Sequence, residues 1–146
     1  MLNRRLFSRT TRYFLSPLSN RRRQHYFHSS QVAQTGQELK GTDQNFEKLV
    51  EQASEPVIVD FYADWCGPCR VLGPLIKKVV EANKKVTLVK LDIEENKLVA
   101  EKFMISSLPT VKAFHKGKEI DTFIGLRDSS FIKDFVEKTG SLATDS

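Results

Sequence analysis

An alternation of buried strands with a long amphipathic helix constrains the fold of this chain more than any other feature. Val57–Tyr62 and Val86–Ile93 are short, nearly continuous apolar runs, as strands buried on both faces of a sheet are. Between them, Pro68–Asn83 carries its apolar side chains along one broad helical stripe. Strand, helix and strand in this order favour two parallel strands joined by a helical crossover.

Three further elements are predicted after the second strand. Asn96–Phe103 has the spacing of a short helix, whereas Thr110–His115 and Glu119–Ile124 read as two strands joined by a tight hairpin. The hairpin adds antiparallel pairing to the parallel strands. We therefore predict an α/β fold with a central mixed sheet and helices on both of its faces.

Individual residues predict how the helices begin, end and pack. Asp128 is a good N-cap for a last helix, in which we expect Phe131 to point inward and Gly140 to end the helix. In the long helix, Val71 belongs to the apolar stripe. Pro74 lies inside the same helix and is expected to kink it, because proline lacks a backbone donor.

The segment before the first buried strand is less regular. Thr42 is a good cap for a helix, and Phe46, Leu49 and Val50 follow at helical spacing. A strand before Thr42 stays open, because only Leu39 is apolar there.

Basic charge is confined to the first 37 residues. They hold seven arginines and no acidic residue, whereas residues 38–146 hold 16 basic and 18 acidic residues. An arginine-rich, acid-free, amphipathic N-terminus is typical of an organellar transit peptide. We predict a mitochondrial transit peptide in residues 1–37, a matrix location, and one domain in residues 38–146. The alternative is a disordered basic tail that contacts RNA or anionic lipid.

Composition excludes several classes of protein. The body has no basic patch, so we do not expect it to bind nucleic acid. No apolar run approaches the roughly 18 residues that a membrane span needs. Two cysteines are too few for a secreted scaffold held together by disulfides.

Both cysteines, Cys66 and Cys69, lie where the first buried strand ends and the long helix begins. The two residues between them let the sulfurs approach to bonding distance within the first helical turn. Cys66 falls at the helix N-terminus, where unpaired N–H groups and the helix dipole stabilise a thiolate. Cys69 lies one turn deeper, and we expect it to be more buried. This arrangement predicts a redox-active dithiol.

Three other roles are conceivable for the cysteines. A zinc site needs four ligands, and the body adds only His115 to the two cysteines, so we predict no metal. A structural disulfide across two residues constrains almost no chain entropy. Buried, inert cysteines do not suit a strand-to-helix turn, which is an exposed place. Redox chemistry is favoured over all three.

Asp60 lies in the middle of the first apolar run, where a carboxylate is costly to bury. One interpretation is a residue at the strand end that is satisfied by a hydrogen bond. The other is a proton acceptor for Cys69 whose pKa is raised by loss of solvent.

The stretch Val59–Cys69 resembles the active-site strand and turn of the thioredoxin family. Leu108-Pro109-Thr110 resembles the cis-proline loop of that family, and Gly125 matches the glycine before its last helix. The resemblance runs from about Thr42 to Gly140. With the leader, the chain is most similar to mitochondrial members of the family, of the plant type.

The resemblance implies a thioredoxin fold and a role for each site residue. Cys66 would be the nucleophile and Cys69 the resolving cysteine, with Asp60 as proton acceptor. Tyr62 stands where many relatives carry tryptophan. The remaining implied residues tune the redox pair (Gly67, Pro68), tune the acid (Lys90) or bind the substrate (Trp65, Leu108, Pro109, Gly125).

The resemblance also implies the reaction and its partners. The chain would reduce disulfides of target proteins such as peroxiredoxins. An NADPH-dependent thioredoxin reductase would reduce it again, without a cofactor bound to the chain, which we expect to be a monomer. Two rival functions are an oxidase or isomerase with a more oxidising couple, and a subunit of the same fold that binds a partner without turnover.

Overall fold

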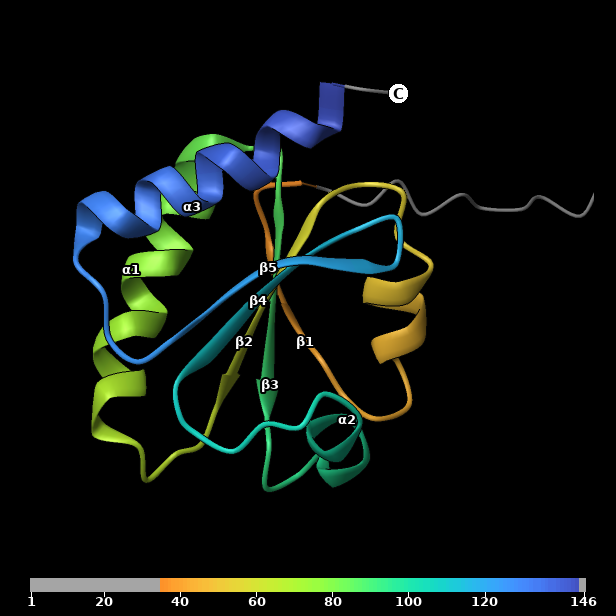
Figure 1. Ribbon diagram of the computed structural model, residues 1–146, viewed down its shortest axis with the longest axis vertical. Coiled ribbons are helices and arrows are strands. Elements are labelled where there is room, and N and C mark those ends of the chain that lie inside the picture. Colours follow the sequence, from red (N-terminus) through yellow and green to blue (C-terminus); the bar gives the residue numbers. More distant parts are fainter. Residues whose placement is uncertain (1–34, 145–146) are drawn as a thin grey trace, which may run out of the picture. The chain divides into compact units, whose positions relative to one another are not determined.

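A five-stranded mixed sheet forms the centre of the computed structural model, which describes residues 35–144 (Figure 1). Residues 1–34 of the predicted transit peptide lie outside the described part. The elements follow one another as β1 (Glu38–Lys40), η1 (Glu47–Glu51), β2 (Val57–Tyr62), α1 (Gly67–Asn83), β3 (Thr87–Asp92), α2 (Lys97–Lys102), β4 (Thr110–His115), β5 (Lys118–Ile124), α3 (Ser129–Ser141) and η2 (Leu142–Thr144). The predicted α/β fold is confirmed.

The strands lie in the order β1-β3-β2-β4-β5. β2 pairs in parallel with β3, and α1 supplies the predicted crossover between them. β4 pairs antiparallel with both β2 and β5. A strand does precede Thr42: β1 runs parallel to β3 at the edge of the sheet, with Glu38 opposite Leu88.

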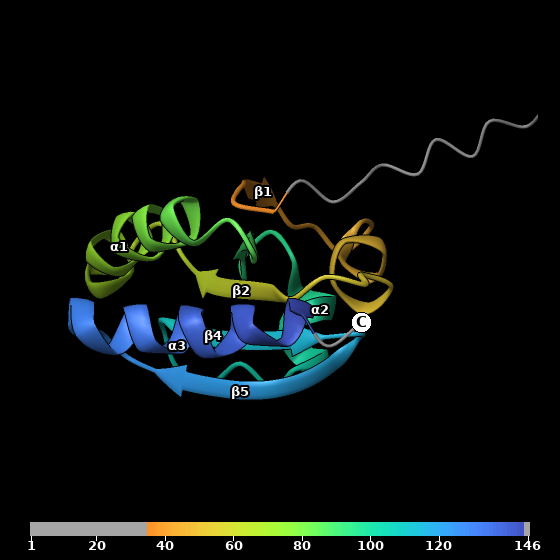
Figure 2. The ribbon, with the colours of Figure 1, turned by 90° about the horizontal axis from the view of Figure 1, so that it is seen from above.

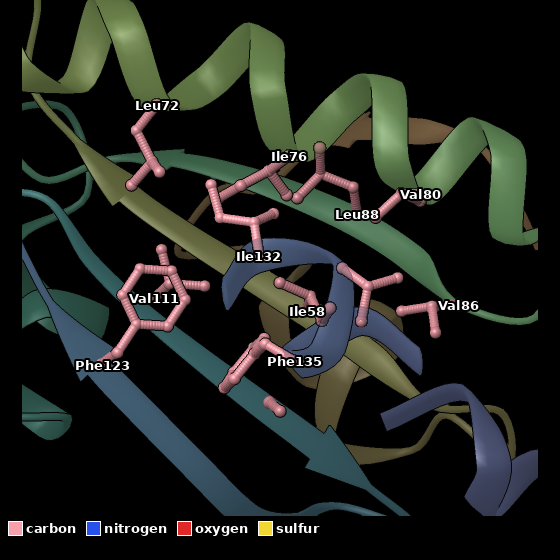
Figure 3. Packing of buried hydrophobic residues seen from close by; sticks show 12 residues of the cluster. Ile58, Leu72, Ile76, Val80, Val86, Leu88, Val111, Phe123, Ile132 and Phe135 are labelled. Atoms are coloured by element: carbon pink, nitrogen blue, oxygen red, sulfur yellow. The ribbon is translucent and has the colours of Figure 1, made fainter. Parts of the chain in front are cut away.

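Alternate residues of β2 enter two separate apolar cores, one on each face of the sheet. Ile58 packs with residues of α1 and α3, including Leu72 and Ile76, as Figure 3 shows. Val59 packs in the other core with residues of η1 and α2. Figure 1 shows α1 and α3 on one side of the strands and α2 on the other, and Figure 2 shows the same elements from above. Helices on both faces are thus as predicted.

The helix before β2 differs in type from the prediction. η1 is a short π-helical turn, in which the backbone N–H of Gln52 donates to the carbonyl oxygen of Glu47 at 2.8 Å. Thr42 does cap the segment before it, since its Oγ1 accepts a hydrogen bond of 3.2 Å from the backbone N–H of Asn45. Apolar spacing over so few residues does not separate an α from a π turn.

Asp128 caps α3 as predicted, because its Oδ1 accepts a hydrogen bond of 2.8 Å from the backbone N–H of Phe131. The prediction that Gly140 ends this helix is wrong, since α3 continues to Ser141. A Cβ atom on Gly140 would lie 2.8 Å from Oδ1 of Asn83, at the end of α1. Gly140 therefore serves the close approach of the two helices.

Two apolar side chains are more exposed than the helical spacing predicts. Val71 is 53% exposed and Phe131 is 41% exposed. Val71 points about 100° away from its neighbour Leu72, which is on the buried side of α1. Phe131 packs edge-on against Phe123 with ring centroids 5.3 Å apart, and this contact leaves part of the side chain open to solvent.

The hairpin between β4 and β5 turns at Lys116 and Gly117, whose φ values are 50° and 76°. Positive φ at both central residues is what the tight hairpin turn of type I′ requires. Among residues 35–144, no helix combines the length and the apolar character that crossing a membrane requires.

Candidate active site

The two cysteines lie where β2 leads into α1. Cys66 is the N-cap of α1 and is joined to Cys69 by a disulfide, with Cα atoms 5.3 Å apart. Sγ of Cys66 also accepts a hydrogen bond of 3.3 Å from the backbone N–H of Cys69. Gly67 and Pro68 begin the helix, where proline is tolerated because first-turn N–H groups have no internal acceptor. A thiolate at Cys66 would face the positive end of the helix dipole.

The burial of the cysteines differs from the prediction in two ways. Cys66 is 4% exposed and Cys69 is 5% exposed, so Cys69 is not the more buried of the two. The turn also does not expose its cysteines, although we expected an exposed place. In the oxidised pair the sulfurs are bonded to each other, so both side chains share one environment.

Asp60 is the fourth residue of β2 and is fully buried. Neither of its carboxylate oxygens has a hydrogen-bond partner. Burial raises its pKa from 3.8 to about 6, although the positive charge of Lys90 opposes the shift. The interpretation of Asp60 as a hydrogen-bonded residue at a strand end is therefore wrong. The carboxyl group is instead able to exchange a proton near neutral pH.

Gly73 connects the helix of the cysteines to Asp60. It lies four residues after Cys69, so the two residues share one face of α1. A Cβ atom on Gly73 would lie 3.7 Å from Oδ2 of Asp60 and 3.2 Å from Nζ of Lys90. The face of α1 that carries Cys69 thus packs on the carboxylate. Gly73 is not among the predicted site residues, although its spacing from Cys69 was a signal.

Lys90 lies on β3 directly opposite Asp60 in the parallel register. Its Nζ lies 4.5 Å from the centre of the Tyr62 ring. It takes part in none of the ion pairs found between residues 35 and 144. Lys90 is therefore a close neighbour of the buried acid without being bonded to it.

Three loops emerge at the end of the sheet where β2 stops. Phe61 of β2 pairs with Thr110 of β4, which pairs in turn with Ile124 of β5. The loops that follow β2, precede β4 and follow β5 therefore lie at the same end of the sheet as the cysteine pair. These loops carry the four predicted substrate-binding residues, Trp65, Leu108, Pro109 and Gly125.

Two of these loops are directly bonded to each other. The backbone N–H of Gly125 donates a hydrogen bond of 2.8 Å to the carbonyl oxygen of Pro109. Gly125 has a φ of 84°, which glycine adopts without steric cost. The peptide bond between Leu108 and Pro109 is cis, as the resemblance implies.

Polar contacts hold the loop before Cys66. Trp65 is 64% exposed, and its Nε1 donates a hydrogen bond of 2.9 Å to Oε1 of Glu94. Arg70 donates from Nε and Nη2 to the carbonyl oxygen of Asp64, at 3.1 and 2.6 Å. Glu94 is not among the predicted site residues, and no local signal could have found it, because it contacts Trp65 only through the fold.

Within residues 35–144, no three His, Cys, Asp or Glu side chains gather as a metal site would require. The chemistry that the site offers is that of the two sulfurs and the neighbouring buried carboxyl group.

Residues 37–138 match the model of the family described as Thioredoxin. The chain belongs to the thioredoxin family. It is 37% identical over 114 residues to the mitochondrial thioredoxin of Rattus norvegicus, covering 77% of this chain and 68% of that protein. It is 39% identical over 99 residues to a thioredoxin of Rickettsia felis, covering 67% of this chain and 94% of that protein.

Solved thioredoxin structures share the fold. A mutant thioredoxin of Halobacterium salinarum superposes with a TM-score of 0.66 at 30% identity, covering 72% of this chain and 92% of that one. The thioredoxin of Malassezia sympodialis gives a TM-score of 0.65 at 30% identity, covering 77% and 98%. The predicted thioredoxin fold is therefore confirmed.

The family and the bonded cysteine pair together establish the reaction class. The chain is a thiol–disulfide oxidoreductase of the protein-disulfide reductase type, and Cys66 and Cys69 form its redox-active disulfide. Thioredoxins in general act with thioredoxin reductase and with proteins that carry disulfides, and they hold no bound cofactor. The zinc, structural and inert roles for the cysteines are thereby set aside.

Proposed function

We propose that this chain is a general reductant of protein disulfides in which Cys66 attacks, Cys69 resolves and Asp60 accepts the proton of Cys69. The observation that carries the role of Asp60 is its buried, unpartnered carboxylate against the face of α1 that bears Cys69. Its pKa of about 6 is close enough to neutral pH for the group to take up a proton and return it.

The first step is attack on the target. The thiolate of Cys66 attacks one sulfur of the target disulfide, forms a mixed disulfide and displaces the other target sulfur as a thiolate. The position of Cys66 at the N-terminus of α1 stabilises the attacking thiolate. Gly67 and Pro68 shape this turn and so tune the redox potential of the Cys66–Cys69 couple.

The second step releases the target. Cys69 gives its proton to Asp60, and its sulfur attacks Sγ of Cys66, which breaks the mixed disulfide and frees the second target thiolate. Two electrons have then passed from the dithiol to the target, and the Cys66–Cys69 disulfide remains. NADPH supplies two electrons for the next cycle through a thioredoxin reductase.

Targets would bind at the end of the sheet that carries the cysteines. This end presents the exposed side chain of Trp65 and the hydrogen-bonded loops of Pro109 and Gly125. Leu108 is half-buried beside them. A surface built largely of backbone suits loose binding of many extended target segments.

Turnover with a thioredoxin reductase, NADPH and a disulfide substrate such as insulin tests the cycle. Cys66→Ser should abolish turnover, and Cys69→Ser should trap mixed disulfides. Asp60→Asn should slow the resolving step on the order of 100-fold, as loss of a general base does. Unchanged resolution in Asp60→Asn would refute the proton-acceptor role. Full biological activity of Cys66→Ser would favour the rival binding function.

The redox potential separates a reductant from an oxidase or isomerase. The reference potentials, which were measured on other proteins, are about −270 mV for thioredoxin and about −180 mV for protein disulfide isomerase. We expect the Cys66–Cys69 couple to lie near the more reducing value. A potential near that of protein disulfide isomerase would overturn the proposal that the chain reduces its targets.

We also propose a mitochondrial location in the matrix, with residues 1–37 as the transit peptide. Support comes from the mitochondrial relatives in rat, cow and mouse and from the arginine-rich, acid-free leader. That the chain is a mitochondrial thioredoxin of the plant type stays a prediction. A reporter fused to residues 1–37 should enter the matrix and resist protease there. A reporter that stays in the cytosol would favour the basic-tail alternative.

The partners follow from the same proposal. We expect an NADPH-dependent thioredoxin reductase as electron donor and peroxiredoxins among the targets. The Cys69→Ser variant should capture these targets as mixed disulfides from a mitochondrial extract. We expect the chain to act as a monomer, which sedimentation of both redox states will check.

A further inference from the structure

Lys90 and Asp60 face each other on neighbouring strands and yet form no ion pair. They are partners in the parallel register, and both side chains border Gly73. Neither carboxylate oxygen of Asp60 has a hydrogen-bond partner. The Lys90 ammonium lies instead 4.5 Å from the centre of the Tyr62 ring, within the range of a cation–π interaction.

The ring and the carboxylate compete for one ammonium group. Tyr62 follows Asp60 by two residues along β2, so both side chains lie on the same face of the sheet. Lys90 reaches this face from β3, and Gly73 of α1 leaves the room that its Nζ occupies. The ammonium of Lys90 and the carboxylate of Asp60 thus border the same glycine.

We propose that Tyr62 is a positioning residue, whose ring holds the Lys90 ammonium and keeps it from forming an ion pair with Asp60. This inference rests on the proposed role of Asp60 as the proton acceptor for Cys69. An ion pair with Lys90 would stabilise the charged carboxylate and weaken it as a base. The ring thereby keeps Asp60 able to bind the proton of Cys69 and return it.

Among the described residues, Lys90 is the cation whose charge lowers the pKa of Asp60. Glu38 acts on Asp60 from β1 but is paired with Lys77 at 3.4 Å. Lys40, the register partner of Lys90 on β1, is paired with Glu95 at 2.9 Å. Gly73 of α1 and Val111 of β4, which pack on Asp60, are uncharged. The charged groups that act on Tyr62 are Asp92, Asp64, Lys40 and Glu95.

The test is the titration of the Asp60 carboxyl carbon by NMR in the oxidised full-length chain, where the cysteines do not titrate. Tyr62→Ile keeps a strand-forming side chain but removes the ring. We expect the pKa of Asp60 to fall by about one unit in this variant, because an opposite charge moves into contact. Tyr62→Phe keeps the ring and should leave the pKa unchanged.

A second background separates the effect of the ammonium from that of water. In Lys90→Met the pKa of Asp60 should rise, and adding Tyr62→Ile should then have no further effect. If Tyr62→Ile lowers the pKa equally with and without Lys90, water has reached the carboxylate and the proposal is overturned. An unchanged pKa in Tyr62→Ile also overturns it.

The geometry is testable without any variant. A ring 4.5 Å away should shift the ε-proton resonances of Lys90 upfield in the unaltered protein. Resonances at ordinary lysine positions would overturn the proposal even if Tyr62→Ile fails to fold. If the titrations agree while Asp60→Asn resolves mixed disulfides normally, Tyr62 positions Lys90 but the proposed role of Asp60 fails.

Discussion

Trp65 donates a hydrogen bond of 2.9 Å to Glu94, and this bond connects the loop before the disulfide to the loop after β3. The indole ring is 64% exposed, so burial alone does not hold it. A single polar contact therefore orients a large apolar side chain beside Cys66, at the edge where we propose that targets bind.

We predict that Glu94→Ala makes the indole ring more mobile. Trp65 is the only tryptophan of the chain, so its fluorescence anisotropy reports this motion directly. Anisotropy should fall, while the free energy of unfolding changes by less than about 1 kcal/mol, as for one exposed hydrogen bond. Glu95→Ala is the matched control, because Glu95 pairs with Lys40 instead. Equal anisotropy in the two variants would contradict the prediction.

The elements of the fold could be predicted because their signals are local. β2 and β3 are apolar runs, and the Asp128 cap and the Lys116-Gly117 turn each occupy adjacent residues. The burial of Asp60 followed from its place inside such a run. The identity of neighbouring residues was enough to predict each of these features.

Contacts between distant segments could not be predicted in this way. Helical spacing placed Phe131 inward, but its exposure depends on how residues from other elements, such as Phe123, pack against the ring. Gly140 looked like a helix end because nothing in the sequence shows that α3 meets Asn83 there. The cation–π contact of Lys90 likewise exists only after β2 and β3 pair.

We predict that Asp60→Asn stabilises the folded chain at pH 7. Folding raises the pKa of Asp60 from 3.8 to about 6, so the folded state binds the proton more tightly than the unfolded state. The stability that this group contributes is present below pH 4, is lost as pH rises from about 4 to 6, and is absent above. The shift corresponds to about 3 kcal/mol at most.

Urea unfolding of both proteins at pH 4 and pH 7 measures this effect. The difference in the free energy of unfolding between Asp60→Asn and the unaltered chain should be large at pH 7 and should shrink toward pH 4. The other titrating groups are the same in both proteins, so their contributions cancel in the comparison. A difference independent of pH would show that Asp60 has an ordinary pKa in the fold.

Two glycines with positive φ should respond differently to alanine. A Cβ on Gly117 would collide with the backbone carbonyl oxygen of Glu51, whereas a Cβ on Gly125 would meet nothing within 4 Å. Gly125→Ala should cost only the left-handed backbone term of about 1–2 kcal/mol. Gly117→Ala should cost about 2 kcal/mol more, because backbone must move. Thermal unfolding of both variants checks this, and equal costs would exclude the collision.

Asp43 caps α2 from a distant part of the chain. Its Oδ1 accepts a hydrogen bond of 3.0 Å from the backbone N–H of Val99, and its Oδ2 accepts one of 3.4 Å from Leu98. The residue at the N-cap position, Asn96, makes no side-chain cap to α2. A helix of six residues has little stability of its own, so it depends on this carboxylate.

We therefore predict that Asp43→Ala destabilises the chain by about 1 kcal/mol, the usual cost of losing a cap. Hydrogen exchange should become faster at the Leu98 and Val99 amides and stay unchanged in α3. Asp43→Asn keeps one acceptor oxygen and should lose less. Glu47→Ala removes another carboxylate of the same segment, which bonds to Gln52, and serves as control. α2 packs through Val99 against the apolar core that includes Val59 of β2. If hydrogen exchange at the Leu98 and Val99 amides becomes equally faster in both alanine variants, the loss of a negative charge in this segment, and not the loss of the Asp43 cap, explains the effect.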